Sequence, residues 1–264
     1  MIISVVIPMY NAEETIIETL NSVKTQNVLP FEIIVINDGS TDDSNNIVSD
    51  YISKNSLLNI TLINKINGGV STARNAGIKA ARGNWIALLD SDDKWFPNKL
   101  ERQIEVLQQN PQIDFLGASR NGEYFGNILW KKINVLTKIS YKMLLVKFVF
   151  IVPTIIFKKS ITETVGFFDE NQRYAEEGIY FIRIAKKFNC YLLNESLAFT
   201  GGGKNHFGDS GLSGNLKEME KGELKNLKDL LGDKSINYLQ YLGLVIFSIL
   251  KYIRRIIVVK LRKI

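Results

Sequence analysis

Residues 85–93 read WIALLDSDD, an apolar run that ends in three acidic side chains. Four similar short apolar runs occur along the first 120 residues, at 3–8 (ISVVIP), 32–38 (EIIVIND), 60–63 (ITLI) and 114–119 (DFLGAS). Continuous apolar runs of this length are typical of parallel strands that are covered on both faces. We therefore expect these segments to form one buried, mainly parallel sheet.

Helical patterns alternate with these runs. Apolar residues recur at helical spacing in 12–26 and 97–109, and later in 176–188 and 215–231. Strands that alternate with helices predict a doubly wound α/β domain. The segment 200–214 holds six glycines and is predicted to be a mobile loop.

The rhythm of the chain changes at two points, after residues 120 and 214, which indicate its organisation. We expect a catalytic domain over 1–214, with a nucleotide-binding half at 1–120 and an acceptor half plus loop at 121–214. The remaining residues, 215–264, are predicted to be a C-terminal, amphipathic helical extension that associates with membranes.

The net charge of +6 is confined to the end of the chain, because residues 251–264 carry six basic side chains and no acidic one. The rest of the chain is neutral, so we expect no nucleic-acid partner. The uncharged run at 242–250 is too short to span a bilayer. Two interpretations remain: a helix lying on an anionic membrane surface, which we favour, and a terminal helix packed on the domain.

Two features bear on the cellular compartment. Cys190 is the single cysteine, so no intrachain disulfide can form, as is usual in a reducing compartment. The apolar run at 2–7 lacks the basic start and cleavage site of a signal peptide and is predicted to be a buried strand. We therefore expect the catalytic part to stay in the cytoplasm.

Acidic side chains follow two of the predicted strands. Asp38 follows one strand, and Asp90 and Asp92 follow another. The carboxyl ends of parallel strands meet at one edge of a sheet, which is where ligands bind in open α/β sheets. Mg²⁺ and Mn²⁺ prefer carboxylate and phosphate oxygens, so this edge is a candidate site for a metal and a nucleotide. The chain contains neither a P-loop nor a Gly-x-Gly-x-x-Gly fingerprint.

Several motifs, in this order, resemble those of the family-2 glycosyltransferases. They are VVIPMYNAEETI, IIVINDGSTDDS, NGGVSTARNAGIKAARGNWIALLDSDD, and GFFDE followed by AEEGIYFIRIA, and together they span about residues 2–200. The resemblance implies a GT-A fold: a mixed, mainly parallel sheet flanked by helices. It also implies a metal-dependent, inverting transferase that uses a nucleoside-diphosphate sugar, often a UDP-sugar.

The resemblance also assigns roles to residues of the donor site. The donor-binding residues that it implies are Pro8, Tyr10, Asp38, Arg74, Asp90 and Ser91. Pro8 and Tyr10 would line the nucleobase pocket, and Asp38 would accept a hydrogen bond from the uracil imide. Arg74 would lie near the base or the diphosphate, and Asp90 would hold the ribose.

The metal site and the catalytic base are assigned in the same way. Asp92 would bind Mn²⁺ or Mg²⁺, and Asp93 is expected to cap the following helix. The family often has Glu-Asp before an aromatic-rich helix with a downstream arginine, and this chain has Glu176-Glu177 and then Arg183. We assign Glu177 as the base, with Glu176 as the alternative. Both acids could instead only favour the start of a helix through its dipole.

Four further residues are candidates of lower standing. His206, the only histidine, and Lys204 lie in the glycine-rich loop and could contact the diphosphate or the metal, or remain exposed to solvent. Trp95 could flank the donor sugar or pack in the core, and Trp130 could form an acceptor platform.

These observations predict a glycosyltransferase that moves a sugar onto an acceptor hydroxyl. The basic tail suggests an acceptor that is a lipid-linked saccharide or an oligosaccharide, used in surface polysaccharide synthesis of the O-antigen or capsule type. It also suggests peripheral attachment at the cytoplasmic face of the inner membrane. The alternatives are a nucleotidyltransferase, which would need a basic triphosphate loop where this chain has MYNAEE, and a non-catalytic membrane-associated scaffold.

Overall fold

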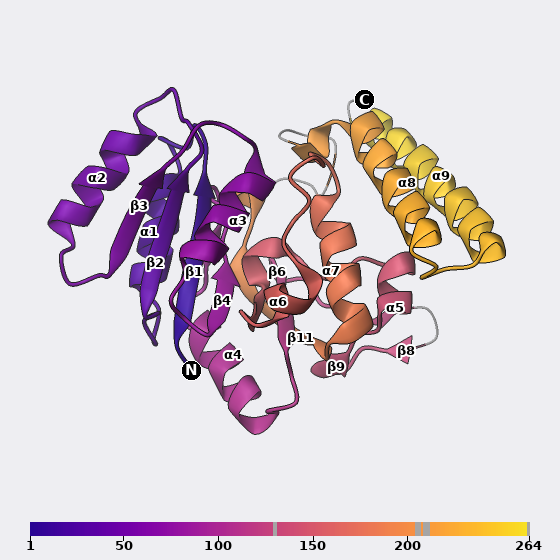
Figure 1. Ribbon diagram of the computed structural model, residues 1–264, viewed down its shortest axis with the longest axis horizontal. Coiled ribbons are helices and arrows are strands. Elements are labelled where there is room, and N and C mark those ends of the chain that lie inside the picture. The colour runs from indigo at the N-terminus through magenta and orange to yellow at the C-terminus, as the bar shows by residue number, and fades with distance from the viewer. Residues whose placement is uncertain (129–130, 204–206, 208–211, 263–264) are drawn as a thin grey trace.

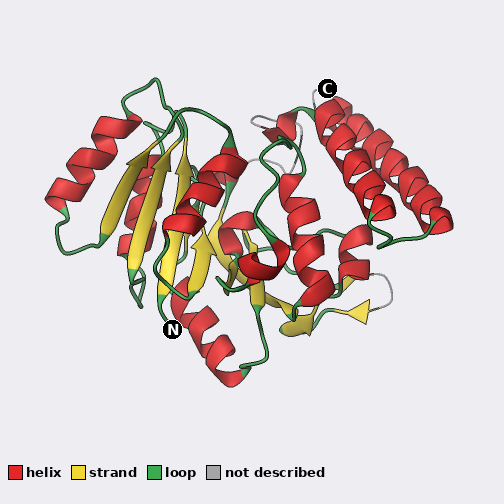
Figure 2. Cartoon of the chain, in the orientation of Figure 1, coloured by secondary structure: helices red, strands yellow, loops and turns green. Residues whose placement is uncertain are grey.

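The computed structural model describes residues 1–128, 131–203, 207 and 212–262, and a mixed nine-stranded sheet runs through it (Figures 1 and 2). The strand order is β3 (Ile60–Asn64), β2 (Glu32–Asn37), β1 (Ile3–Met9), β4 (Trp85–Leu88), β10 (Ile156–Lys158), β6 (Phe115–Arg120), β11 (Cys190–Phe199) and β5 (Lys94–Trp95), with β9 (Leu136–Lys138) beside β11. Strands β1 to β4 are mutually parallel, and β11 is parallel to β6. Only β10, β5 and β9 run antiparallel to their neighbours in this sheet, within the described residues.

Two hydrophobic cores cover the two faces of this sheet. Alternate residues of β1 point to opposite faces, so that Val6 belongs to one core while Val5 and Ile7 belong to the other. Helices α1 (Ile16–Lys24), α2 (Ser44–Lys54) and α4 (Lys99–Gln109) cover one face, and α3 (Val70–Ala80), α5 (Tyr141–Val146), α6 (Ile161–Val165) and α7 (Glu176–Lys187) cover the other. The predicted GT-A-type α/β class, with a mainly parallel sheet between helices, is confirmed.

Helix α3 packs closely on β1 because residue 77 is a glycine. A Cβ atom at Gly77 would lie 2.4 Å from Cγ1 of Val6. This close approach fixes the position of α3, and with it Arg74, relative to the carboxyl end of the sheet.

The second half of the chain is less regular. The stretch after β6 forms β9 and a separate two-stranded ribbon of β7 (Asn127–Ile128) and β8 (Lys131–Lys132). Strand β10 lies between β4 and β6 and runs against both. The segment that leads from α5 into β10 therefore crosses the carboxyl-end edge, where it lines the groove described below.

The C-terminal helices α8 (Leu216–Gly232) and α9 (Tyr238–Leu261) lie side by side at one end of the molecule (Figure 1). Leu230 of α8 is buried in the same core as α7, and α9 packs on α8. Asn237 and Gln240 form a reciprocal capping box at the start of α9. No helix in the described part of the chain is long and apolar enough to cross a membrane.

Candidate functional site

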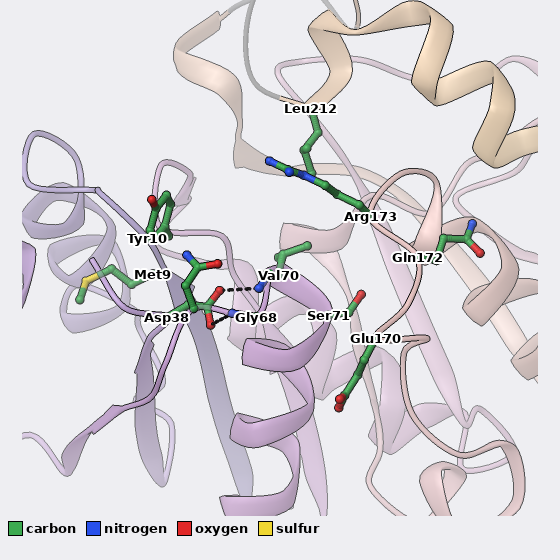
Figure 3. A pocket seen from close by; sticks show the side chains of 12 residues that line it. Met9, Tyr10, Asp38, Gly68, Val70, Ser71, Glu170, Gln172, Arg173 and Leu212 are labelled. Carbon is green, nitrogen blue, oxygen red and sulfur yellow. Dashed lines mark hydrogen bonds between the residues drawn. The ribbon is translucent and has the colours of Figure 1, made fainter. Parts of the chain in front are cut away.

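The parallel strands place the predicted residues at one edge of the sheet, as expected from their positions in the sequence. Two connected hollows lie there: a pocket of about 600 Å³ and a larger groove of about 1300 Å³. Tyr10 lines both hollows, and Asp38 lines the pocket (Figure 3). Asp90 and Asp92 line the groove, as does buried Pro8.

Asp38 organises the wall of the smaller pocket. Its carboxylate is buried and accepts hydrogen bonds from the backbone N–H of Gly68 at 3.0 Å and of Gly69 at 2.8 Å (Figure 3). Lys65 donates to the same carboxylate. Gly69 has a φ of +88°, a value that favours glycine. The hydrogen bonds to Asp38 hold this turn in place before α3. The ring of Tyr10, about half exposed, lines the same pocket.

Arg74 lines the groove, and its expected place near the base or the diphosphate stays a prediction. It is 4% exposed and bridges two carboxylates: Nη2 lies 2.9 Å from Oδ1 of Asp90, and Nη1 lies 3.0 Å from Oε1 of Glu176. Burial alone would lower the pKa of Arg74, but the charges of Asp90 and Glu176 raise it. Arg74 therefore joins the donor edge of the sheet to the start of α7.

The two neighbouring glutamates at the start of α7 have different surroundings. Glu176 is 4% exposed, and burial together with the charge of Glu177 raises its pKa to about 8, against the opposing effect of Arg74. Glu177 is half-buried and lines the groove. Ala175, in the left-handed region with a φ of +56°, turns the chain into the helix at this point. Both glutamates line the groove, but Glu176 is buried against Arg74, while Glu177 is partly exposed.

Asp93 does not cap the helix that follows it, contrary to the prediction. Its Oδ1 accepts a hydrogen bond from the backbone N–H of Gly201 at 2.7 Å, because the chain inserts β5 before α4 begins at Lys99. Burial and the charges of Asp90 and Asp92 raise the pKa of Asp93 to about 8. The carbonyl of Ser91, the remaining residue of the motif, accepts from the hydroxyls of Thr15 and Thr19.

The donor set at this edge fits a hard divalent cation that also binds phosphate oxygens. The carboxylate of Asp92 is exposed to the groove, and the raised pKa of Asp93 reflects the local concentration of negative charge. Within the part of the chain that the structure describes, no three His, Cys, Asp or Glu residues are grouped closely enough to hold a metal ion. A metal at Asp92 would therefore need oxygen ligands from a substrate, a usual arrangement for Mg²⁺.

Of the four remaining candidates, the structure describes only Trp95. Trp95 is 3% exposed, and its Nε1 donates to the carbonyl of Pro153 at 2.6 Å, so it packs in the core and does not flank a donor sugar. Its position in β5, paired with β11, explains this burial. Three candidates lie outside the described residues: Trp130, Lys204 and His206.

Sequence reasoning missed the residues that line the groove from the second half of the chain. Arg173 lines both hollows, and Lys147 and Phe148 line the groove beside Phe125. These residues lie in irregular connections, between α5 and β10 or just before α7, where no periodic pattern marks them. Only the presence of a charged side chain beside aromatic residues in YKMLLVKFVF could have drawn attention to them.

Comparisons with known proteins show the family of this chain. The family model for "Glycosyl transferase family 2" matches residues 4–177. The chain belongs to glycosyl transferase family 2. The putative teichuronic acid biosynthesis glycosyltransferase TuaG of Bacillus subtilis is 30% identical to this glycosyltransferase over 199 residues, which cover 75% of this chain and 77% of TuaG.

Two further comparisons extend this assignment. The UDP-Glc:α-D-GlcNAc-diphosphoundecaprenol β-1,3-glucosyltransferase WfgD of Escherichia coli is 38% identical over 115 residues, 44% of each chain. The crystal structure of S. aureus TarS residues 1–349 in complex with UDP-GlcNAc superposes with a TM-score of 0.69 at 21% identity, covering 93% of this chain and 70% of that one. Two other curated glycosyltransferases are longer, and the matched segments span 33% and 20% of their lengths.

Proposed function

We propose that this family-2 glycosyltransferase moves a sugar from a UDP-sugar to an acceptor hydroxyl with inversion at the anomeric carbon. The observation that carries the proposal is that Asp92 and Glu177 line one groove, which continues from the pocket of Tyr10 and Asp38. The choice of UDP is supported by the structural neighbour TarS, solved with UDP-GlcNAc, and by the donor named for WfgD.

Each residue at this edge has one task in the proposed reaction. Tyr10 stacks on the base, Asp38 holds the turn that forms the base pocket and accepts from the base, and Asp90 binds the ribose. Glu177 removes the proton of the acceptor hydroxyl while that oxygen attacks the anomeric carbon. The bond from this carbon to the diphosphate breaks on the opposite face, and UDP leaves with the electron pair. Mn²⁺ or Mg²⁺ held by Asp92 would neutralise the charge that develops on the leaving diphosphate.

The choice of Glu177 over Glu176 follows from their contacts. A base must reach the proton of the acceptor, so it must face the groove and carry a negative charge at working pH. Both glutamates line the groove, but Glu176 is buried against Arg74 and has a raised pKa, whereas Glu177 is partly exposed. Glu176 therefore serves in our proposal to hold the start of α7 against the donor edge.

A panel of nucleotide sugars tests the reaction. We expect one UDP-sugar to be hydrolysed slowly, and to be transferred once an acceptor is added, with Mn²⁺ or Mg²⁺ required and EDTA abolishing turnover. The product glycoside should have the anomeric configuration opposite to that of the donor. If no nucleotide sugar turns over and UDP with Mn²⁺ leaves the melting temperature unchanged, the non-catalytic scaffold is the better description.

We further propose that the acceptor is a lipid-linked saccharide and that α9 rests on an anionic membrane surface. The outer face of α9 carries an exposed apolar stripe at helical spacing: Leu239, Leu242, Ile246, Ile249, Leu250, Ile253, Ile257 and Leu261. An exposed apolar surface of this extent on a helix that does not span a bilayer supports an interfacial position. Exposed Arg254 and Lys260 on the same helix favour anionic lipid.

The structure corrects one part of the charge prediction for the tail. Lys251 and Arg255 do not face outward, because both pair with Glu223 of α8, at 2.9 Å and 2.7 Å. The burial of Ser248 against α8 places this side of α9 inward and the apolar stripe outward. Membrane attachment in our proposal therefore depends more on the apolar stripe than on the six basic residues.

Vesicle flotation tests this attachment. Ile249→Glu combined with Ile253→Glu should release the protein from anionic vesicles, while Leu57→Glu, at a fully exposed site far from α9, should leave flotation unchanged. Such a position at the cytoplasmic face of the inner membrane would suit surface polysaccharide synthesis, to which the name of TuaG also points. If the wild type does not float at low salt but forms a dimer that the double variant loses, the stripe is an interface between copies.

A further inference from the structure

The groove has a second end, beyond Glu177, that the donor-side chemistry does not use. There it is lined by apolar side chains from Phe125, from the segment 148–153 and from Met219 of α8. The donor end, in contrast, is lined by the carboxylates of the DSDD motif. The lining of one groove thus includes an acidic part, called its donor end, and an apolar part, called its far end.

A cation stands within this apolar wall. Lys147 is the first residue after α5, its side chain is exposed, and its Nζ lies 5.3 Å from the ring centroid of Phe125. The ammonium makes one long hydrogen bond, 3.5 Å to the carbonyl of Asn127, and no ion pair with any residue that the structure describes. Glu123 also lines the groove, but no ion pair joins it to Lys147. Lys147 therefore offers a positive charge that no described carboxylate neutralises.

The neighbouring aromatic side chain is held rigidly while remaining accessible. Phe148 is 40% exposed, and its ring is parallel to that of Phe181, with an interplanar angle of 5° and centroids 6.0 Å apart. Phe181 is itself fully buried and packs edge-to-face on Phe115 and Phe150. Phe148 thus presents a fixed apolar surface to the groove that Lys147 also lines.

We infer that Lys147 and Phe148 form a subsite for the aglycone of the acceptor, which is an apolar chain joined to the acceptor sugar through phosphate. The ammonium binds phosphate oxygens through charge-assisted hydrogen bonds. The ring of Phe148 covers the first part of the chain, and Ile151 and Met219 extend the apolar surface. This inference rests on the proposed function, which requires an acceptor in this groove, and adds the residues that select its phosphate-linked lipid.

Calorimetric binding of decyl diphosphate, with saturating UDP and Mn²⁺ present to fill the donor site, tests the subsite. We expect the wild type to bind decyl diphosphate more tightly than inorganic diphosphate. Lys147→Gln should weaken both ligands roughly tenfold, the effect of one charge-assisted hydrogen bond. Phe148→Ala should weaken decyl diphosphate alone, also roughly tenfold, through lost apolar burial. Phe148→Leu, which preserves contact with Phe181, should lose less.

The controls separate the failure of this inference from the failure of the proposed function. Lys142→Gln, at an exposed position on α5 away from the groove, should leave both affinities unchanged. If UDP with Mn²⁺ binds the wild type but Lys147→Gln has the same diphosphate affinities, or if decyl diphosphate does not bind at all, the subsite is refuted. If UDP itself does not bind, the donor site fails instead.

Discussion

The two ends of the groove are built by different means. At the donor end, buried charges are tied to one another across the sequence: Arg74 joins Asp90 to Glu176, and Asp93 holds the backbone of Gly201. At the far end, Lys147 and Phe148 are exposed, and the cation has one long hydrogen bond. The difference suggests that the donor end is preorganised for one chemical group, whereas the far end presents surface to a ligand held mainly by contact and charge.

The largest expected effect comes from breaking the network of the donor end. Arg74→Ala removes the common partner of two carboxylates, one of them buried, and should lower the free energy of unfolding by about 3–5 kcal/mol. Urea denaturation measures this loss. Lys221→Ala, which removes one partner of the exposed pair with Glu218 on α8, should cost only about 1 kcal/mol or less. Equal losses of unfolding free energy in the two variants would show that the Arg74 bridge stabilises the fold no more than an exposed ion pair does.

The next effect concerns catalysis and separates the two glutamates. Glu177→Gln should leave the KM of the donor nearly unchanged and lower kcat by ~10² or more, the usual size of a general-base effect. Glu176→Gln preserves the shape of the side chain that contacts Arg74 and should lower kcat less. Steady-state kinetics of both variants decide the matter, and a greater loss of kcat in Glu176→Gln would exchange the two roles.

A smaller effect is expected in the pH dependence of stability. The pKa of Glu176 is raised from 4.5 to about 8, so between these values the folded state binds more protons than the unfolded state. The stability of the wild type should therefore fall as pH rises from about 5 to 8, relative to Glu176→Gln, by about 1 kcal/mol or more. Denaturation of both proteins across this range is the measurement, and parallel curves would show that Glu176 keeps an ordinary pKa.

The donor end could be predicted from sequence and the far end could not, for a physical reason. Strand runs such as 85–90 end in acidic residues, and the parallel sheet alone brings Asp38, Asp90 and Asp92 to one edge. Lys147 and Phe148 reach the groove only because β10 runs antiparallel between β4 and β6. No local periodicity specifies that insertion.

The sequence also could not predict which residues pair with one another in the site. Arg74 in STARN is expected near the base or the diphosphate, but its pairing with Asp90 and Glu176 depends on how α3 packs on β1 at Gly77. Asp93 lies where a helix cap is expected, but β5 comes before α4. The carboxylate of Asp93 accepts a hydrogen bond from the backbone N–H of Gly201 instead. Long-range packing decided both outcomes.

Binding of UDP in the presence and absence of Mn²⁺, measured by thermal shift, tests most directly the central claim that the donor end is a metal-dependent nucleotide site. UDP with Mn²⁺ should raise the melting temperature of the wild type and of Lys147→Gln alike, because a ligand that binds the folded state stabilises it. Asp92→Ala should retain the melting temperature of the free protein and lose the shift. A full Mn²⁺-dependent shift in Asp92→Ala would contradict the account.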